Sequence, residues 1–202
     1  MALNGGMLGK LILAQCASKG ILGSEIAKFS KAMGEGIVES FVEMNKVQTI
    51  DVGVMTSGTG KGKMSGVVST ALSGMVIPLL MSQGILGTRM KDLAEAVCNA
   101  TAMHLNTMNM VETTHSTVAL GSGVGKVTGL IPAKMESKIL QKMMANNYNG
   151  TMMKPLVKAI SVGICTNVMA TAIVSVVIVG APAPLILGVP IPSSGSGKGK
   201  VT

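Results

Sequence analysis

Apolar residues recur at helical spacing in three long segments of the chain. The first segment carries them at Ile26, Phe29, Met33, Ile37, Phe41 and Met44. A shift of 64 residues gives Met90, Leu93, Val97, Thr101, Leu105 and Met108, and a further 63 gives Met153, Leu156, Ile160, Ile164, Val168 and Thr171. Residues three and four apart share one face of a helix, so each set predicts an amphipathic helix with a buried face.

Two short glycine signatures occur in the same order in each of three parts of the chain. Gly-Ile-Leu-Gly-Ser at 20–24 recurs as Gly-Ile-Leu-Gly-Thr at 84–88 and more weakly as Asn-Tyr-Asn-Gly-Thr at 147–151. A Gly-x-Gly-x-Gly-Lys segment begins at Gly58 and recurs at Gly121 and at Gly195. Self-similarity at a fixed period indicates a repeat architecture. The sequence therefore predicts three tandem units, 1–65, 66–128 and 129–202.

Each unit has the pattern of a helix, a glycine, a longer helix, an extended segment and a Gly-Lys strand. Residues 47–55, 111–120 and 172–179 are rich in residues that favour strands, as are residues 185–191. Unit three has an additional Pro-rich β segment whose residues 180–184 predict a hairpin. Ser24, Thr88 and Thr151 are the predicted helix N-caps. The expected fold class is α+β and helix-dominated, with three tandem helix-pair-plus-strand repeats in a pseudo-threefold or solenoid arrangement.

The Gly-Lys segments are the candidate interaction sites. In an extended strand the alternating glycines share one bare face, which lets another backbone approach and suits strand addition between repeats or subunits. The candidate residues are Gly58, Gly60, Gly62, Lys63, Gly121, Gly123, Gly125, Lys126, Gly195, Gly197, Gly199 and Lys200. A nucleotide-binding P-loop has four residues between its first Gly and its Gly-Lys pair, and Ser or Thr after the Lys. Here only three residues separate Gly58 from Gly62-Lys63, and Met64 follows, so the segment is no P-loop. A flexible Gly-Ser-Lys linker is the alternative.

The composition favours contact surfaces over pockets. The chain has 26 Gly and 18 Met among 202 residues, but no Trp, one Tyr and two Phe. Pockets usually draw on aromatic side chains, whereas Met packs against imperfectly matched surfaces. Cys16, Cys98 and Cys165 are widely spaced and are expected to be reduced and buried. His104 and His115 stand alone, so we expect no metal and no cofactor.

The charge of +8 leaves an acidic partner open. Lys134, Lys138 and Lys142 follow one another at a spacing of four residues and predict a basic stripe on the first helix of unit three. This stripe is either a solvated helix face or a set of contacts to an acidic partner or a phosphate backbone. A basic module that binds DNA or assists its packaging is therefore the alternative function.

A membrane-active protein that uses residues 159–191 is a further alternative. Residues 159–197 carry no charge, and 159–179 are long enough to span a bilayer. The corresponding helices of units one and two carry acidic residues such as Glu39 and Asp92, which favours burial by protein instead. No secretion signal is recognisable near the N-terminus, so we expect a protein made in the cytoplasm and not secreted.

The sequence offers no catalytic constellation, since no nucleophile elbow and no pair of carboxylates in an apolar setting is present. We therefore expect no enzyme. The Gly-x-Gly-x-Gly-Lys-[Val/Met]-[Thr/Ser] segments, and the last one with Pro182, Pro184, Pro190 and Pro192 before it, resemble small virion structural proteins of contractile-tailed bacteriophages. The resemblance implies a non-enzymatic virion protein of the neck, tail or baseplate. Its partners would be other virion proteins or copies of itself.

Overall fold

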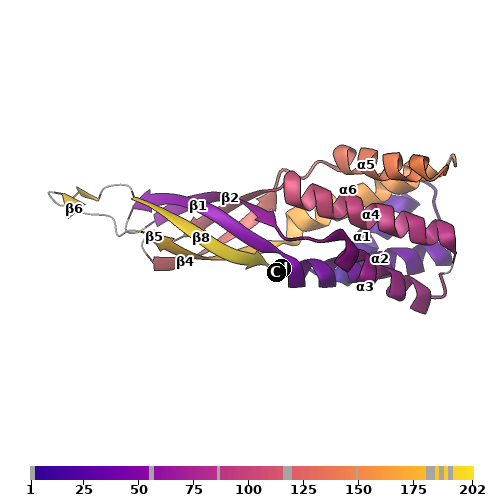
Figure 1. Ribbon diagram of the computed structural model, residues 1–202, viewed down its shortest axis with the longest axis horizontal. Helices are drawn as coiled ribbons and strands as arrows, with labels where there is room; N and C mark the ends of the chain where they lie inside the picture. The colour runs from indigo at the N-terminus through magenta and orange to yellow at the C-terminus, as the bar shows by residue number, and fades with distance from the viewer. Residues whose placement is uncertain are drawn as a thin grey trace.

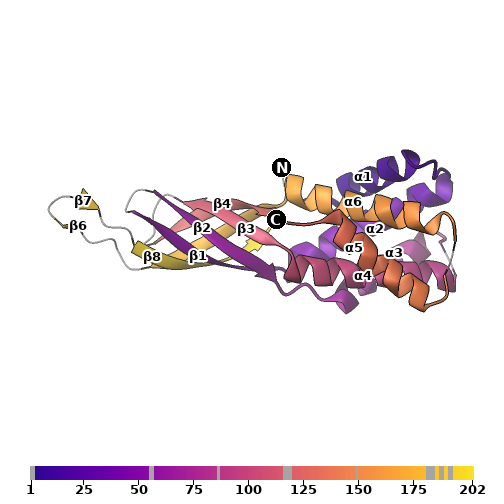
Figure 2. The same ribbon diagram turned by 90° about the horizontal axis from the view of Figure 1, so that it is seen from above.

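The computed structural model places helices at one end of an elongated molecule and a β-barrel at the other (Figure 1). The structure describes residues 3–54, 57–85, 87–115, 120–148, 150–180, 185–186, 189–190 and 193–202. Leu86, Asn149, the predicted hairpin residues 181–184 and Pro192 therefore lie outside the described residues. The helical end is broader than the barrel when the molecule is seen from above (Figure 2).

The helices form a closed ring. Short and long helices alternate in the order α1 (Gly5–Ala17), α2 (Ser24–Met44), α3 (Ser69–Ser82), α4 (Thr88–Thr107), α5 (Pro132–Ala145) and α6 (Met153–Thr171). Each helix packs against the next one along the chain, and α6 packs against α1. Glycine permits the close contact of α1 with α2, because a Cβ atom on Gly34 would lie 2.4 Å from the carbonyl oxygen of Gly5.

The predicted apolar faces of the long helices point into this ring. Phe29, Met33, Ile37 and Phe41 of α2 are buried, as are Leu93, Val97, Thr101 and Leu105 of α4 and Ile160, Ile164 and Val168 of α6. The predicted N-caps are wrong. Gly23 and Gly87 cap α2 and α4 without a side-chain hydrogen bond, and α6 is capped by Met152, so that Thr151 lies outside it. Glycine at positive φ (137° at Gly23 and 128° at Gly87) turns the chain there instead.

The strands close into an antiparallel barrel. Its order is β1 (Lys46–Val54), β2 (Ser57–Ser65), β3 (Met110–His115), β4 (Leu120–Thr128), β5 (Ile173–Gly180) and β8 (Ser193–Val201), and β8 pairs with β1. The short strands β6 (Leu185–Ile186) and β7 (Val189–Pro190) pair with each other and lie beyond the barrel end that is remote from the helices (Figure 1).

The expected fold class is wrong. The expectation is of three separate units with open tail strands, whereas the two strands that follow each helix pair in the described chain join those of the other thirds in one closed six-stranded barrel. The physical reason lies in the edges. A lone tail strand leaves unpaired backbone groups on both sides, and closing hairpins into a barrel removes every such edge. The Gly-Lys segment 195–202 is accordingly paired on both sides within the chain, with β5 and with β1.

Two buried asparagines fasten the helices to the barrel. Asn45 follows α2, and its side-chain Nδ2 donates to the carbonyl oxygen of Val201 at 3.0 Å while its Oδ1 accepts from the Val201 N–H. Asn109 follows α4 and binds the backbone of Met64 in the same way, with Nδ2 donating to the Met64 carbonyl oxygen at 2.9 Å. Each asparagine therefore joins its helix to a strand from a different third of the chain.

Candidate interaction surface

The candidate glycines face the interior of the barrel. Side chains alternate across a strand, and β2, β4 and β8 turn their glycines inward. A Cβ atom on Gly60 would lie 1.9 Å from Oδ1 of Asp51, and one on Gly197 would lie 2.2 Å from Oγ1 of Thr49. A Cβ atom on Gly62 would lie 1.9 Å from the carbonyl oxygen of Gln48. The glycines therefore make room for neighbouring strands and interior side chains, and they present no free face to another subunit.

All six strands contribute one residue to the first layer of the barrel interior, and β1, β3 and β5 fill the layers beyond it. Next to the helices lies an apolar layer of Val47, Met64, Val111, Val127, Val174 and Val201. Thr49, Thr113 and Val176 follow, each opposite a glycine, and then Asp51, His115 and Ile178. In these layers β2, β4 and β8 contribute only glycines, which leaves room for one interior side chain from each of β1, β3 and β5. The described part of the interior is consequently filled with buried side chains.

Asp51 and His115 form a buried pair inside the barrel. Nε2 of His115 lies 3.4 Å from Oδ1 of Asp51, and neither side chain has any exposed surface. The Thr49 hydroxyl donates to Oδ2 of Asp51 at 2.8 Å, and the Thr113 hydroxyl donates to Oδ1 at 3.4 Å. The expectation that His115 stands alone is wrong, because register brings β1 and β3 onto opposite sides of β2. A buried carboxylate needs such partners.

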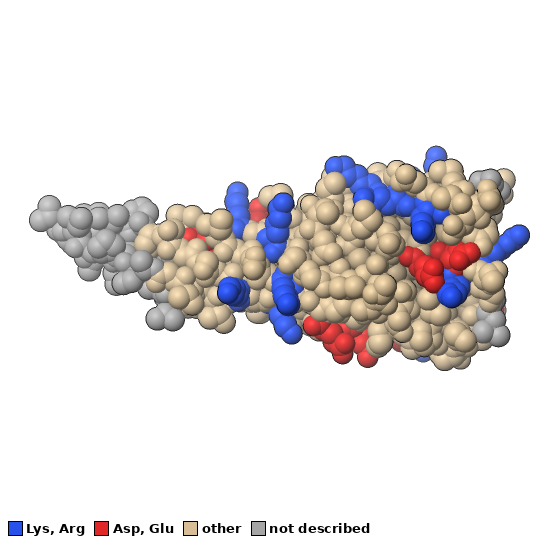
Figure 3. Space-filling view, in the orientation of Figure 1, with Lys and Arg blue, Asp and Glu red and all other residues tan. Residues whose placement is uncertain are grey.

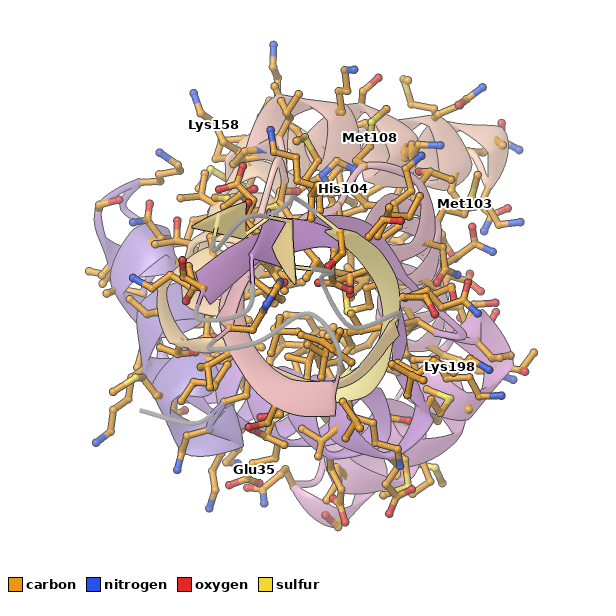
Figure 4. All side chains as sticks on the ribbon, turned by 90° about the vertical axis from the view of Figure 1, so that its left-hand side faces the viewer. Glu35, Met103, His104, Met108, Lys158 and Lys198 are labelled. Atoms are coloured by element: carbon orange, nitrogen blue, oxygen red, sulfur yellow. The ribbon has the colours of Figure 1, made fainter. Side chains whose placement is uncertain are left out.

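The outer wall of the barrel carries a belt of lysines. Six lysines of the described strands are exposed, and we call them the lysine belt: Lys46, Lys61, Lys63, Lys126, Lys198 and Lys200. Lys63, Lys126 and Lys200 each follow the last glycine of their strand and point outward near the helical end. Blue side chains cross the visible width of the barrel there (Figure 3), and Lys198 lies outside the ring of strands in the view along the barrel (Figure 4).

The outer wall also exposes apolar side chains beside the belt lysines and further toward the remote end, since Ile50 pairs in register with Lys61 and Val177 with Lys198. We call the exposed residues there the apolar wall: Ile50, Val52, Val124, Val177 and Val179. Ile50 is 72% and Val177 is 63% exposed. β8, which carries Ser194 and Ser196 outward, separates the apolar residues of β1 from those of β5. The apolar wall therefore consists of two patches, one on β1 and one on β4 and β5, and exposed apolar patches mark contact surfaces.

A groove of about 830 Å³ runs over the outer wall of β2, β3 and β4 and the end of α6. Lys61, Glu112 and Lys126 line it. Glu112 pairs in register with Lys61 on one side and with Lys126 on the other. It is the one acidic side chain that the described barrel strands turn outward.

The predicted basic stripe lies on α5. Lys134 and Lys142 are exposed and Lys138 is partly buried, while Met135, Ile139 and Met143 of the same helix are buried. Burial, together with the nearby charges of Lys138 and Lys134, lowers the pKa of the buried His104. Its Nε2 accepts a hydrogen bond from the backbone N–H of Ile131 at 3.0 Å. The basic stripe therefore lies on α5, apart from the strands that carry the lysine belt, and its charges lower the pKa of His104.

A second hollow, of about 450 Å³, lies between α4, α5 and α6 at the helical end. Arg89, Met143, Tyr148 and Leu156 are among its lining residues. The Tyr148 hydroxyl donates to Oδ2 of Asp92, and the Arg89 guanidinium lies 5.9 Å from the Tyr148 ring centroid. The hydrogen bond to Asp92, followed by burial, raises the pKa of Tyr148. Sequence reasoning missed this hollow, whose residues come from distant segments.

The cysteines are free and buried. Burial raises the pKa of Cys98 and of Cys165 to about 12. In the part of the chain that the structure describes, no three His, Cys, Asp or Glu side chains are grouped so that they could hold a metal ion. Among the described helices, none has the length and apolar character that crossing a membrane requires. α6 ends at Thr171, and the apolar residues that follow it form β5.

Comparison with protein families, with curated proteins and with solved structures finds no match to this chain.

Proposed function

We propose that the protein is a non-enzymatic structural component of a tailed-phage particle, in its neck, tail or baseplate. The observation that carries this proposal is the outer wall of the barrel, where a closed sheet without free edges exposes the lysine belt beside the apolar wall. Charged and apolar side chains spread over a convex wall suit contact with another macromolecule better than the enclosure of a small molecule. The resemblance of the Gly-x-Gly-x-Gly-Lys segments to virion proteins supports the same function.

The test is the presence of the chain in particles. Virions of the phage that encodes it are purified on a density gradient, treated with nuclease, washed at high salt and analysed by quantitative mass spectrometry. We expect the chain at a constant ratio to the other virion proteins. Its loss in the wash, or its absence from the gradient band, would contradict a structural role.

A DNA-binding module is the second candidate function, and the lysine belt is the observation that favours it. Binding of the protein to a 20-base-pair duplex, measured at 50 and 200 mM salt, distinguishes a DNA-binding module from a structural virion protein. A module that neutralises six phosphates should lose about a thousandfold in affinity over this range. We expect weak binding without preference for sequence, and a tight, steeply salt-dependent complex would favour the second candidate.

A further inference from the structure

The lysine belt occupies two opposite sides of the barrel. β8, β1 and β2 are neighbours in the sheet and carry Lys46, Lys61, Lys63, Lys198 and Lys200. Lys126 lies on β4, which β3 separates from β2 and β5 separates from β8. A partner that approaches from one side, such as a straight DNA duplex, cannot contact all of these strands at once. A partner that reaches every belt lysine has to encircle the barrel.

The belt charges have no ion-pair partner within the described chain. The ion pairs formed there join Lys28 to Glu25, Lys91 to Glu95 and His115 to Asp51, and none includes a belt lysine. Glu112 faces Lys61 and Lys126 across the sheet, so one carboxylate stands against six ammonium groups. Crowded like charges repel one another, and carboxylates of a partner at the same level would relieve this repulsion.

The apolar wall identifies the partner as protein. Ile50, Val177 and Val179 are each at least 60% exposed, and Ile50 pairs in register with Lys61 and Val177 with Lys198, so apolar side chains lie directly beside the belt charges. Phosphate backbones offer such residues little apolar surface, whereas protein interfaces bury apolar side chains at their centre and leave charged groups at the rim. The broader helical end lies directly behind the belt and would stop further entry of the barrel (Figures 1 and 2).

We infer that the barrel is seated in the bore of a ring-shaped protein assembly whose inner wall carries Asp and Glu side chains at the level of the lysine belt. The closed sheet excludes strand addition, so the contact is made by side chains alone. This inference rests on the proposed function and adds to it the geometry and the chemistry of the partner.

Chemical footprinting of purified virions tests the inference. Lysine amines are acetylated in the free protein and in the particle, and in a separate, unacetylated sample of particles a zero-length carbodiimide joins free amines to neighbouring carboxylates. We expect Lys126 on β4 and Lys61, Lys63 and Lys200 on the other strands to be protected together. We also expect them to be cross-linked to Asp or Glu of one virion protein. Protection should survive emptying of the particle and nuclease treatment.

A matched pair of variants tests the same inference by assembly. The belt variant Lys63→Gln/Lys126→Gln/Lys200→Gln and the stripe variant Lys134→Gln/Lys138→Gln/Lys142→Gln remove equal charge. Circular dichroism and thermal melting verify that both fold. We expect incorporation into particles to fall about tenfold or more for the belt variant, since three ion pairs with the partner are lost together. The stripe variant should incorporate within about twofold of the parent protein.

Other outcomes separate this inference from the proposed function. Belt lysines that react in the particle as in the free protein overturn the inference, as do cross-links from a single side or protection lost with nuclease. Equal loss of incorporation in both variants overturns it too. In all of these cases the protein is still a virion component. If the chain is absent from the particle, the proposed function fails and the inference fails with it.

Discussion

The interior glycines of the barrel have no space for a side chain. A Cβ atom on Gly60 would lie within 2.4 Å of both Asp51 and Thr113. We expect Gly60→Ala to lower the free energy of unfolding by about 2–4 kcal/mol, measured by urea denaturation. The matched control is Gly74→Ala on α3, where nothing lies within 4 Å of the added atom and helix propensity should add about 0.5–1 kcal/mol. Equal effects at both positions would contradict the packed interior.

His104 should make stability depend on pH. Its lowered pKa means that the unfolded chain binds the proton more readily than the folded protein does. The stabilisation is complete above the unfolded value of about 6.5, and it is lost as the pH falls through the lower folded value. We therefore expect the protein to be less stable at pH 5 than at pH 7.5. His104→Gln keeps an acceptor for the Ile131 N–H and does not titrate.

The measurement is the free energy of unfolding of the parent protein and of His104→Gln at both pH values. The difference between the two proteins isolates His104 from the other titrating groups. A pH dependence that is the same in both proteins would show that His104 is not its source.

The sequence predicts the residues that fill the ring of helices, but it does not predict those inside the barrel. Spacings of three and four identify Phe29, Ile37 and Phe41, because one helix determines which of its own faces is buried. The Asp51–His115 pair depends on the register of β1, β2 and β3, which joins residues 64 positions apart in sequence. Asp51 follows Val47 and Thr49 at alternate positions of a strand, which indicates that all three share one face. This pattern does not show which residue of another strand faces Asp51.

At the scale of elements, a long helix leads into a barrel strand at three junctions, and the third junction lacks the asparagine that the other two have. Asn45 and Asn109 lie two residues before the first inward valines, Val47 and Val111, and bind the backbone of a neighbouring strand. At the third junction Ala172 holds the corresponding place before Val174. Ala172 is buried and cannot form these hydrogen bonds.

Substitutions at these positions should have opposite effects on stability. Asn45→Ala leaves the N–H and the carbonyl of Val201 without their side-chain partner and should lower the unfolding free energy by about 2–5 kcal/mol. Ala172→Asn supplies the missing side chain and should raise it by about 1 kcal/mol. Thermal melting measures both changes. Ala170→Asn, at an exposed site of α6, is the control for helix propensity, and an equal result at Ala170 and Ala172 would argue against a third fastening.

At the scale of the whole molecule, β8 closes the barrel. Its removal would open the edges of β1 and β5, and open strand edges pair with other chains. We expect deletion of residues 193–202 to yield aggregates without a cooperative thermal transition. The control replaces residues 181–192 by Asn-Gly, which together with Ser193 and Ser194 gives a four-residue connection between the paired Gly180 and Gly195 and leaves β5 and β8 intact.

Size-exclusion chromatography and circular dichroism measure the outcome. The control should elute as the parent protein does and melt cooperatively. A truncated protein that remains monomeric and fully helical would show that the ring of helices is stable without the barrel.

The sequence alone does not predict that the strands close into a barrel, and this limits how much of the whole molecule it predicts. The glycine signatures mark the beginnings of α2 and α4 and the strands β2, β4 and β8, because glycine is required locally at each. Nothing local distinguishes a strand that ends a helical unit from a strand that completes a hairpin. The pairing of β1 with β8 joins segments that are far apart in sequence, and this pairing closes the expected tail strands into a barrel.

The hydrogen bonds between Asn45 and Val201 join residues 156 positions apart in sequence. Proteins dominated by such distant contacts fold slowly, on a scale of milliseconds to about seconds, because the entropy of closing the long loop is lost before the contact forms. The early helices can form and pair locally, but the ring cannot close before α6 is present, and the barrel cannot close before β8 is present. The first half of the chain therefore completes neither the ring nor the barrel, and we expect the meeting of the two ends of the chain to limit the rate of folding.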